Sequence, residues 1–134
     1  MVLGRYGRLS ITLGVIVCQG AVIEISWSDR KLEKNCSSDK AGARKWGNEH
    51  WALIRRRLTT LRGAPTLQDM EGAPGKCHAL GADRHGQFAV SLRGQFRLIF
   101  VPNHDPIPQL DAGGVDRSLV TNISITEVAD YHGD

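Results

Sequence analysis

The sequence is poor in the residues that build disulfide frameworks and metal centres. Its three cysteines, Cys18, Cys36 and Cys77, are widely spaced and form no Cys-x-x-Cys pair. An odd number of distant cysteines specifies neither a disulfide framework nor a zinc knuckle, and it favours a reducing compartment. The five histidines show no close metal-binding pair. The sequence therefore predicts no metal site and no cofactor.

Long hydrophobic runs are also lacking. The apolar run at residues 11–18 follows Arg5 and Arg8 and contains Thr12 and Gly14. At about eight residues it is far too short for a membrane span and at the lower limit for the core of a signal peptide. We therefore predict that residues 1–21 are a leader that is disordered or precedes the true start near Val22. Export is the less favoured alternative, and residues 22–134 form one domain.

Several common catalytic signatures are absent as well. The sequence has no P-loop, no GxGxxG and no GxSxG motif, which argues against nucleotide-binding and α/β-hydrolase classes. The net charge is only +3, a weak signal for nucleic acid on its own. Cations do cluster between residues 44 and 62, where Arg55 and Arg56 stand in a row of three arginines. This cluster predicts either a solvated helix face or a surface for phosphates.

A clear β-hairpin pattern lies at residues 86–100. Its two runs alternate apolar and polar residues with a period of two, and a connection containing Gly94 joins them. Phe96 and Leu98 share one face of the second run, and Arg97 lies on the opposite face. Taken alone, Arg97 reads as an ordinary charge on a solvated face.

The remaining segments predict an α+β domain. Two N-terminal helices are expected to pack on a mainly antiparallel sheet of four to five strands. The helices are predicted from near Arg30 and over residues 43–61, separated at Gly42. Further strands are predicted at residues 22–27, 76–80 and 119–128, the last with a bulge between Ile125 and Val128. Residues 101–118 carry three prolines and two glycines and are expected to form a loop that covers part of the surroundings of Arg97 or contacts a partner.

Three features together resemble a known family. They are a Cys77-His78-Ala79-Leu80 strand after a Pro-Gly turn, the hairpin GQFAVSLRGQFRLIF, and a terminal Asp130-Tyr131-His132. Their order and spacing resemble the HigB-type toxins of the RelE/ParE superfamily, often labelled plasmid maintenance system killer proteins. The resemblance covers roughly residues 22–132. It implies a RelE-like α+β fold.

The resemblance also implies an activity and its partners. Toxins of this kind belong to type II toxin–antitoxin modules, and most studied members are endoribonucleases that cut mRNA in the ribosomal A site. The expected partners are a HigA-like helix-turn-helix antitoxin, the ribosome and mRNA, in the cytoplasm and without a membrane. A hetero-oligomer with the antitoxin is expected.

The family's catalytic positions match His78, Arg97, Asp130, Tyr131 and His132. Histidine suits proton transfer near neutral pH, and arginine suits phosphate because it stays charged and presents a planar fork of donors. We expect His78 and His132 to share the acid–base steps and Arg97 to hold the phosphate. Asp130 is expected to be a base or an orienting group, and Tyr131 to stack or hydrogen-bond. Arg55, Arg56 and Arg93 are candidate RNA-binding residues.

Two alternatives to a ribonuclease stay open. The same superfamily includes toxins that poison DNA gyrase without cutting RNA, although acid–base residues have no evident use there. The other alternative is an inactive relative that only binds an antitoxin. If the ribonuclease interpretation is right, His78, Arg97 and His132 should face one cleft.

Overall fold

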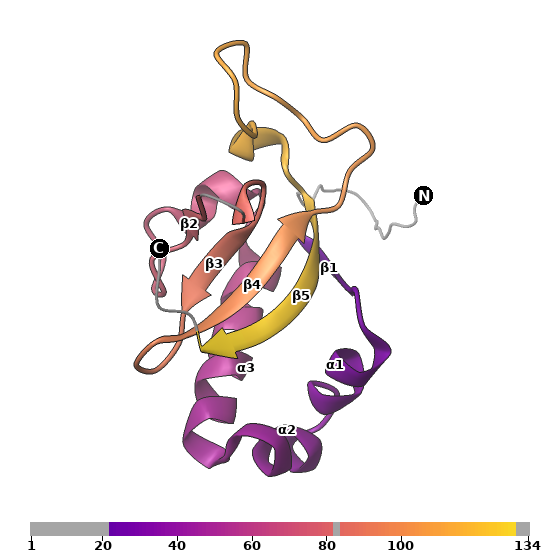
Figure 1. The fold of residues 1–134 in the computed structure, drawn as a ribbon, viewed down its shortest axis with the longest axis vertical. Coiled ribbons are helices and arrows are strands. Elements are labelled where there is room, and N and C mark those ends of the chain that lie inside the picture. Colours follow the sequence, from indigo (N-terminus) through magenta and orange to yellow (C-terminus); the bar gives the residue numbers. More distant parts are fainter. Residues whose placement is uncertain (1–21, 82–83, 131–134) are drawn as a thin grey trace, which may run out of the picture.

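A computed structural model describes residues 22–81 and 84–130, and these form three α-helices and a five-stranded sheet (Figure 1). The strands run in the order β1-β5-β4-β3-β2. Every neighbouring pair is antiparallel except β1 and β5, which are parallel. The elements are β1 (Glu24–Trp27), α1 (Arg30–Asn35), α2 (Asp39–Trp46), α3 (Asn48–Gly63), β2 (His78–Ala79), β3 (Phe88–Ser91), β4 (Phe96–Pro102) and β5 (Asn122–Asp130), with short 3-10 turns η1 (Leu67–Met70) and η3 (Arg117–Leu119). The predicted α+β class is confirmed, and the predicted leader, residues 1–21, lies outside the described residues.

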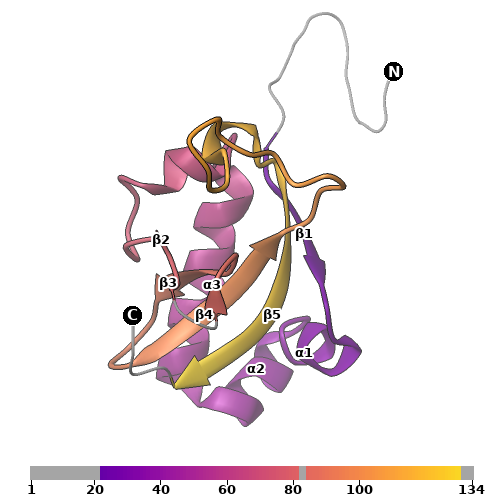
Figure 2. The same cartoon turned by 45° about the horizontal axis from the view of Figure 1, so that its top comes forward.

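Helix α3 covers one face of the sheet, and no helix of the described residues covers the other face (Figures 1 and 2). Ile54, Leu58 and Leu61 of α3 are buried in one cluster with Phe88 and Phe100 of the hairpin. This confirms the apolar face that the alternation predicted. The opposite face, called the open face below, carries a small separate cluster of Leu80, Ala89 and Ile99. Among the described residues, none of the helices has the length and apolar character needed to span a membrane.

The helices break at a different glycine from the one predicted. Gly42 lies inside α2, and the chain instead turns at Gly47, whose φ is +87°. Gly42 is needed for a close contact, because a Cβ added there would lie 2.2 Å from the ring of Trp51. The expected break at Gly42 was therefore wrong. The missing side chain lets α2 and α3 approach each other, and the positive φ at Gly47 makes the corner.

Gly42→Ala is expected to lower the free energy of unfolding by about 1–3 kcal/mol, the usual cost of overpacking a filled core. An alanine in a helix interior normally stabilises by about 1 kcal/mol relative to glycine, so the expected sign is reversed here. Gly63→Ala is the matched control, because nothing lies within 4 Å of a Cβ added there. Urea unfolding of both variants measures the difference. Equal stability of the two would contradict the proposed contact.

Two features of the second half of the chain position the site. Residue Thr126 is extra in β5, because Ile99 is paired with Glu127 and the next residue, Phe100, with Ile125. This bulge falls where the sequence predicted it. The long loop after Pro102 extends beyond the end of the sheet (Figure 1), about 17 Å along β4 from Arg97 at 3.4 Å per residue. The expectation that this loop covers the surroundings of Arg97 was therefore wrong.

Candidate functional site

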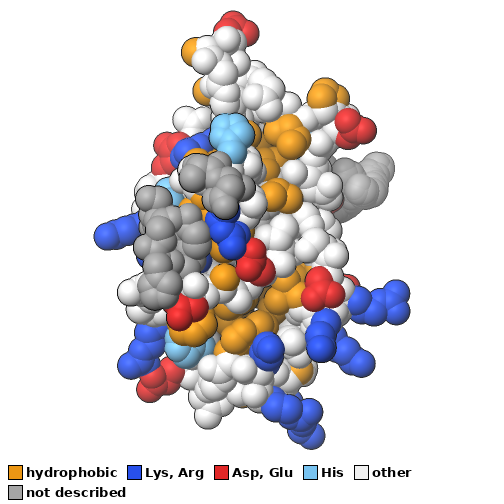
Figure 3. All heavy atoms as spheres, in the orientation of Figure 1, with side chains coloured by type: hydrophobic (Ala, Val, Ile, Leu, Met, Phe, Trp, Pro, Cys, Tyr) orange, Lys and Arg blue, Asp and Glu red, His pale blue; other side chains and the backbone are white. Residues whose placement is uncertain are grey.

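His78 and Arg97 lie on the same face of the sheet. His78 is paired with Ala89 and Ala89 with Ile99, which is two residues from Arg97 on β4. Side chains alternate along a strand, and directly paired residues share a face. Both side chains therefore project from the open face, opposite α3. Figure 3 looks onto this face and shows charged side chains of both signs near its middle.

The imidazole of His78 is fixed in one tautomer. Its Nδ1 lies 2.7 Å from the carbonyl oxygen of Lys76. A carbonyl only accepts, so Nδ1 carries the proton and the neutral ring keeps its basic lone pair on Nε2. The turn before the strand creates this contact, with φ of +106° at Gly75 and +50° at Lys76. The acceptor nitrogen of the neutral ring is therefore Nε2, an atom that is buried.

The guanidinium of Arg97 is anchored by the backbone of the hairpin connection. Its Nη1 donates to the carbonyl oxygens of Phe96 at 3.0 Å and Gly94 at 3.2 Å. Its paired neighbours on the open face are Ser91 and Ala129, which are both small. Arg97 is half-buried and its guanidinium is held by backbone carbonyl oxygens. Its positive charge therefore has a defined position next to the short side chains of Ser91 and Ala129.

The open face holds an ion pair that the sequence did not reveal. Arg84 Nη1 donates to Glu127 Oε2 at 2.9 Å and to Gln87 Oε1 at 3.0 Å. Glu127 is paired with Ile99 and so lies in the same row of the sheet as His78. No sequence signal joins residues 43 positions apart. The contact depends on the register of β5, which only the structure supplies.

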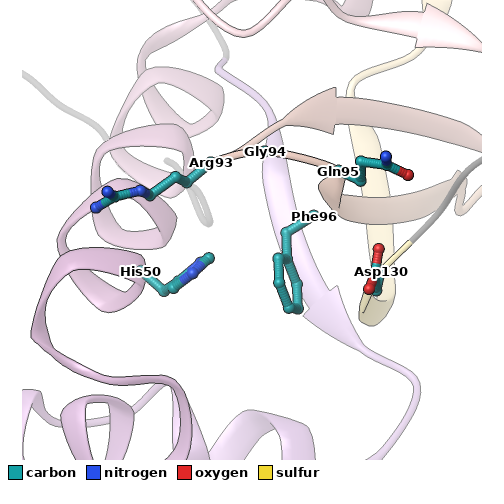
Figure 4. Close-up of a pocket in the computed structure, with 6 residues that line it drawn as sticks. All are labelled: His50, Arg93, Gly94, Gln95, Phe96 and Asp130. Carbon is teal, nitrogen blue, oxygen red and sulfur yellow. The ribbon is translucent and has the colours of Figure 1, made fainter.

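Asp130 lies on the other side of the sheet. It is paired with Phe96, whose ring meets the His50 ring edge-on at 4.6 Å between centroids on the α3 side. Asp130 borders a hollow of about 340 Å³ that is open to solvent. Figure 4 shows the residues that line it, which are His50, Arg93, Gly94, Gln95, Phe96 and Asp130. The structure thus brings His78 and Arg97 to one face and Asp130 to the opposite one. Tyr131 and His132 lie outside the described residues.

The predicted RNA-binding arginines are also away from the open face. Arg55, on α3, is ion-paired with Asp39 at 2.7 Å, and Arg56 is exposed on the same helix. Arg93 is ion-paired with Glu49, at the start of α3. Arg57, on the same helix, reaches the sheet and donates from Nε to the carbonyl oxygen of Ser91 at 2.9 Å.

Among the described residues, the geometry provides neither a metal site nor a cysteine nucleophile. Within residues 22–81 and 84–130, no group of three His, Cys, Asp or Glu side chains is placed to hold a metal ion. Burial raises the pKa of Cys36 and of Cys77 to about 11, so both thiols stay protonated near neutral pH. Among the described residues, the open face carries the imidazole of His78, the guanidinium groups of Arg84 and Arg97, and the carboxylate of Glu127.

Comparison with solved structures identifies the fold. The chain superposes on a YoeB/ParE toxin from Agrobacterium tumefaciens with a TM-score of 0.50 at 9% identity, over 82% of this chain and 100% of that one. It also matches a chain of a YoeB-YefM complex from Staphylococcus aureus with a TM-score of 0.47 at 16% identity, over 84% of this chain and 99% of that one. No family model and no curated protein sequence matches it. The chain therefore has the α+β fold of a YoeB/ParE toxin, and the predicted RelE-like fold is confirmed.

Proposed function

We propose that the protein is the toxin of a type II toxin–antitoxin module and acts as a ribosome-dependent mRNA endoribonuclease of the HigB type. The observation that carries this proposal is the placement of His78 and Arg97 on one open sheet face, with His78 Nε2 as the basic nitrogen. The fold shared with a YoeB/ParE toxin and the matching Asp130-Tyr131-His132 terminus support it. The proposed partners are a HigA-like antitoxin, the ribosome and mRNA, in the cytoplasm.

The proposed reaction needs no metal. The ribose 2′-oxygen attacks the adjacent phosphorus while His78 Nε2 takes the hydroxyl proton. Arg97 stabilises the negative charge that develops on the phosphorane oxygens. The bond from phosphorus to the 5′-oxygen then breaks, His132 protonates that oxygen, and the upstream RNA ends in a 2′,3′-cyclic phosphate.

The two other terminal residues take supporting roles in this mechanism. Asp130 is assigned as an orienting group and not as the base, because its strand position faces α3 and not Arg97. Tyr131 is assigned to stacking on a base or to a hydrogen bond near the scissile phosphate. The candidate RNA-binding residues Arg55, Arg56 and Arg93 would act outside the reaction centre, on the α3 side.

His78→Ala is expected to slow mRNA cleavage about a hundredfold, near the lower end for acid–base catalysis because His132 shares the proton transfers. The assay is primer extension on mRNA in a translation extract that contains ribosomes. His132→Ala is tested beside it, and unchanged cleavage would remove His132 from the mechanism. DNA supercoiling by gyrase is measured in parallel. If supercoiling is inhibited while the mRNA stays intact, the protein is a gyrase poison and not a ribonuclease. If cells that express the protein strongly grow normally, it is an inactive relative.

A further inference from the structure

We propose that Arg57 of α3 is a positioning residue for His78. Its side chain holds the turn at Gly75 and Lys76 in the shape that presents the carbonyl oxygen of Lys76 to the imidazole. This inference deepens the proposed function and rests on it, because the orientation of His78 matters for RNA cleavage only if His78 is the base. Arg57 belongs to neither the hairpin motif nor the terminal motif.

The side chain of Arg57 takes a different course from those of its two neighbours in the row of three arginines. Arg55 is exposed and ion-paired with Asp39, and Arg56 is exposed as well. Arg57 is half-buried and donates from Nε to the carbonyl oxygen of Ser91, the last residue of β3, at 2.9 Å. The third arginine of the row therefore links α3 to the sheet, whereas the first two lie at the surface.

Gly75 lets the Arg57 side chain lie directly against the turn. A Cβ added at Gly75 would be 2.9 Å from Arg57 Nε and 3.0 Å from Arg57 Cδ, which is closer than side chains normally pack. The carbonyl oxygen of Gly75 also accepts from the backbone N–H of Ser91 at 2.6 Å. Ser91 is thus bonded through its carbonyl oxygen to Arg57 and through its N–H to Gly75. These three residues therefore fix one another's positions.

The same turn determines the orientation of His78. Lys76 has a φ of +50°, in the left-handed region that residues with a side chain seldom adopt. Its carbonyl oxygen lies 2.7 Å from His78 Nδ1. Such a backbone conformation persists only where surrounding contacts hold it, and the packing of Arg57 on Gly75 is one of these contacts. Removal of the Arg57 side chain should therefore loosen both the turn and the imidazole ring.

The test observes the tautomer of His78 directly and needs no RNA. The histidines of the full chain are labelled with nitrogen-15, and the long-range couplings between ring nitrogens and carbon-bound protons show which nitrogen carries the proton. The His78 signals are those that disappear in His78→Ala. At a pH where the ring is neutral, the wild type should carry the proton on Nδ1. Arg57→Ala should give a mixture of both tautomers, because the Lys76 carbonyl no longer has one position.

Two further variants separate the hydrogen bond from the charge. Arg57→Gln places an amide N–H at the same number of bonds from Cα as Arg57 Nε, without the charge. Arg57→Lys keeps the charge but carries its donor one bond further out. Glutamine should therefore restore the Nδ1-protonated tautomer more fully than lysine. Equal or better restoration by lysine would contradict the proposed contact, and this comparison remains valid if Arg57→Ala does not fold.

Arg56→Ala is the matched control for the tautomer. It removes the same charge from the next position of the same helix, but its side chain is exposed, so the His78 signals should stay as in the wild type. A role in stability alone would lower the free energy of unfolding of Arg57→Ala without changing the tautomer of the folded protein.

Cleavage kinetics give a second measure of the same effect. Arg57→Ala should lower kcat about tenfold with little change in KM, a smaller loss than in His78→Ala because the base is retained and only its orientation changes. In the His78→Ala background the same substitution should cost little more, because Arg57 acts through His78. Arg117→Ala should cleave at the wild-type rate, since the Arg117 guanidinium lies over the Phe88 ring on the α3 side, 5.2 Å from its centroid.

The outcomes separate this inference from the proposed function. A wild type without the Nδ1-protonated tautomer, or a tautomer that is the same in the wild type and in every folded Arg57 variant, overturns the inference. If the wild type nevertheless cleaves mRNA, the proposed function stands. A tautomer mixture in Arg57→Ala that glutamine reverses, without any cleavage by the wild type, supports the positioning of His78 by Arg57 and contradicts the ribonuclease.

Discussion

Arg97→Ala is expected to lower the rate of mRNA cleavage about 10²–10³-fold, the loss typical when a positioned donor to a developing negative charge is removed. The fold should be unaffected, because Arg97 projects from the open face, outside the main core, and its Nη1 donates to the backbone carbonyl oxygens of Phe96 and Gly94 within the hairpin. The measurement is single-turnover cleavage in a ribosome-containing extract. Unfolding in urea should be close to that of the wild type.

Arg97→Lys distinguishes charge from geometry. Lysine keeps the positive charge but lacks the planar fork, so only part of the activity should return. Arg117→Ala, which removes a cation from the α3 side, serves as the control and should cleave at the wild-type rate. Full activity of Arg97→Ala would remove the central observation of the proposed mechanism. Equal losses in Arg97→Ala and Arg117→Ala would point to net charge instead.

Trp51→Ala is expected to have the largest effect on stability, a loss of about 3–5 kcal/mol, as for other buried aromatic residues cut back to alanine. The ring is only 6% exposed and stacks on Trp46 at 6.1 Å between centroids. It also fills the space that Gly42 leaves between α2 and α3. Far-UV circular dichroism during urea unfolding measures the loss. A loss below 1 kcal/mol would show that α2 adds little to the core.

Trp51→Phe isolates the polar part of this contact. Trp51 Nε1 donates to Asp39 Oδ1 at 2.8 Å, and a phenylalanine loses that hydrogen bond while keeping an aromatic ring in the core. The same bond, followed by that from Arg55, lowers the pKa of Asp39 below 3.8. The stability linked to this shift is present above pH 3.8 and is lost as the pH falls through the lowered pKa of the folded state. Trp51→Phe should therefore lose less stability than the wild type on acidification below pH 4. An identical acid dependence in both would contradict this coupling.

Local sequence patterns were sufficient to predict the hairpin but not the boundary between helices α2 and α3. The alternation around Phe88 and Phe96 reports directly which face is buried, because the period of a strand is two residues. The helix break predicted at Gly42 was wrong, because a glycine in a helical pattern can mark either the end of a helix or the close approach of another side chain. Which of the two applies depends on Trp51, nine residues further on, and on the tertiary contact between α2 and α3.

The faces of β5 show a second limit of sequence reasoning. Without the extra residue Thr126, strict alternation from the buried Ile125 would have placed Asp130 on the open face and Glu127 on the α3 side. The bulge exchanges these positions, so Glu127 meets Arg84 and Asp130 meets Phe96. The sequence predicted a bulge between Ile125 and Val128 but not which residue of that stretch is the extra one. A shift of one residue decides which acid faces the proposed substrate.

The order of the strands also bears on the tendency of the chain to aggregate. The two longest strands, β4 and β5, lie inside the sheet, and the edges of the described part are β1 with four residues and β2 with two. Short edge strands offer few unpaired backbone groups to a neighbouring molecule. Within the described residues, the sheet therefore offers little edge for pairing with a neighbouring molecule, which disfavours edge-to-edge aggregation.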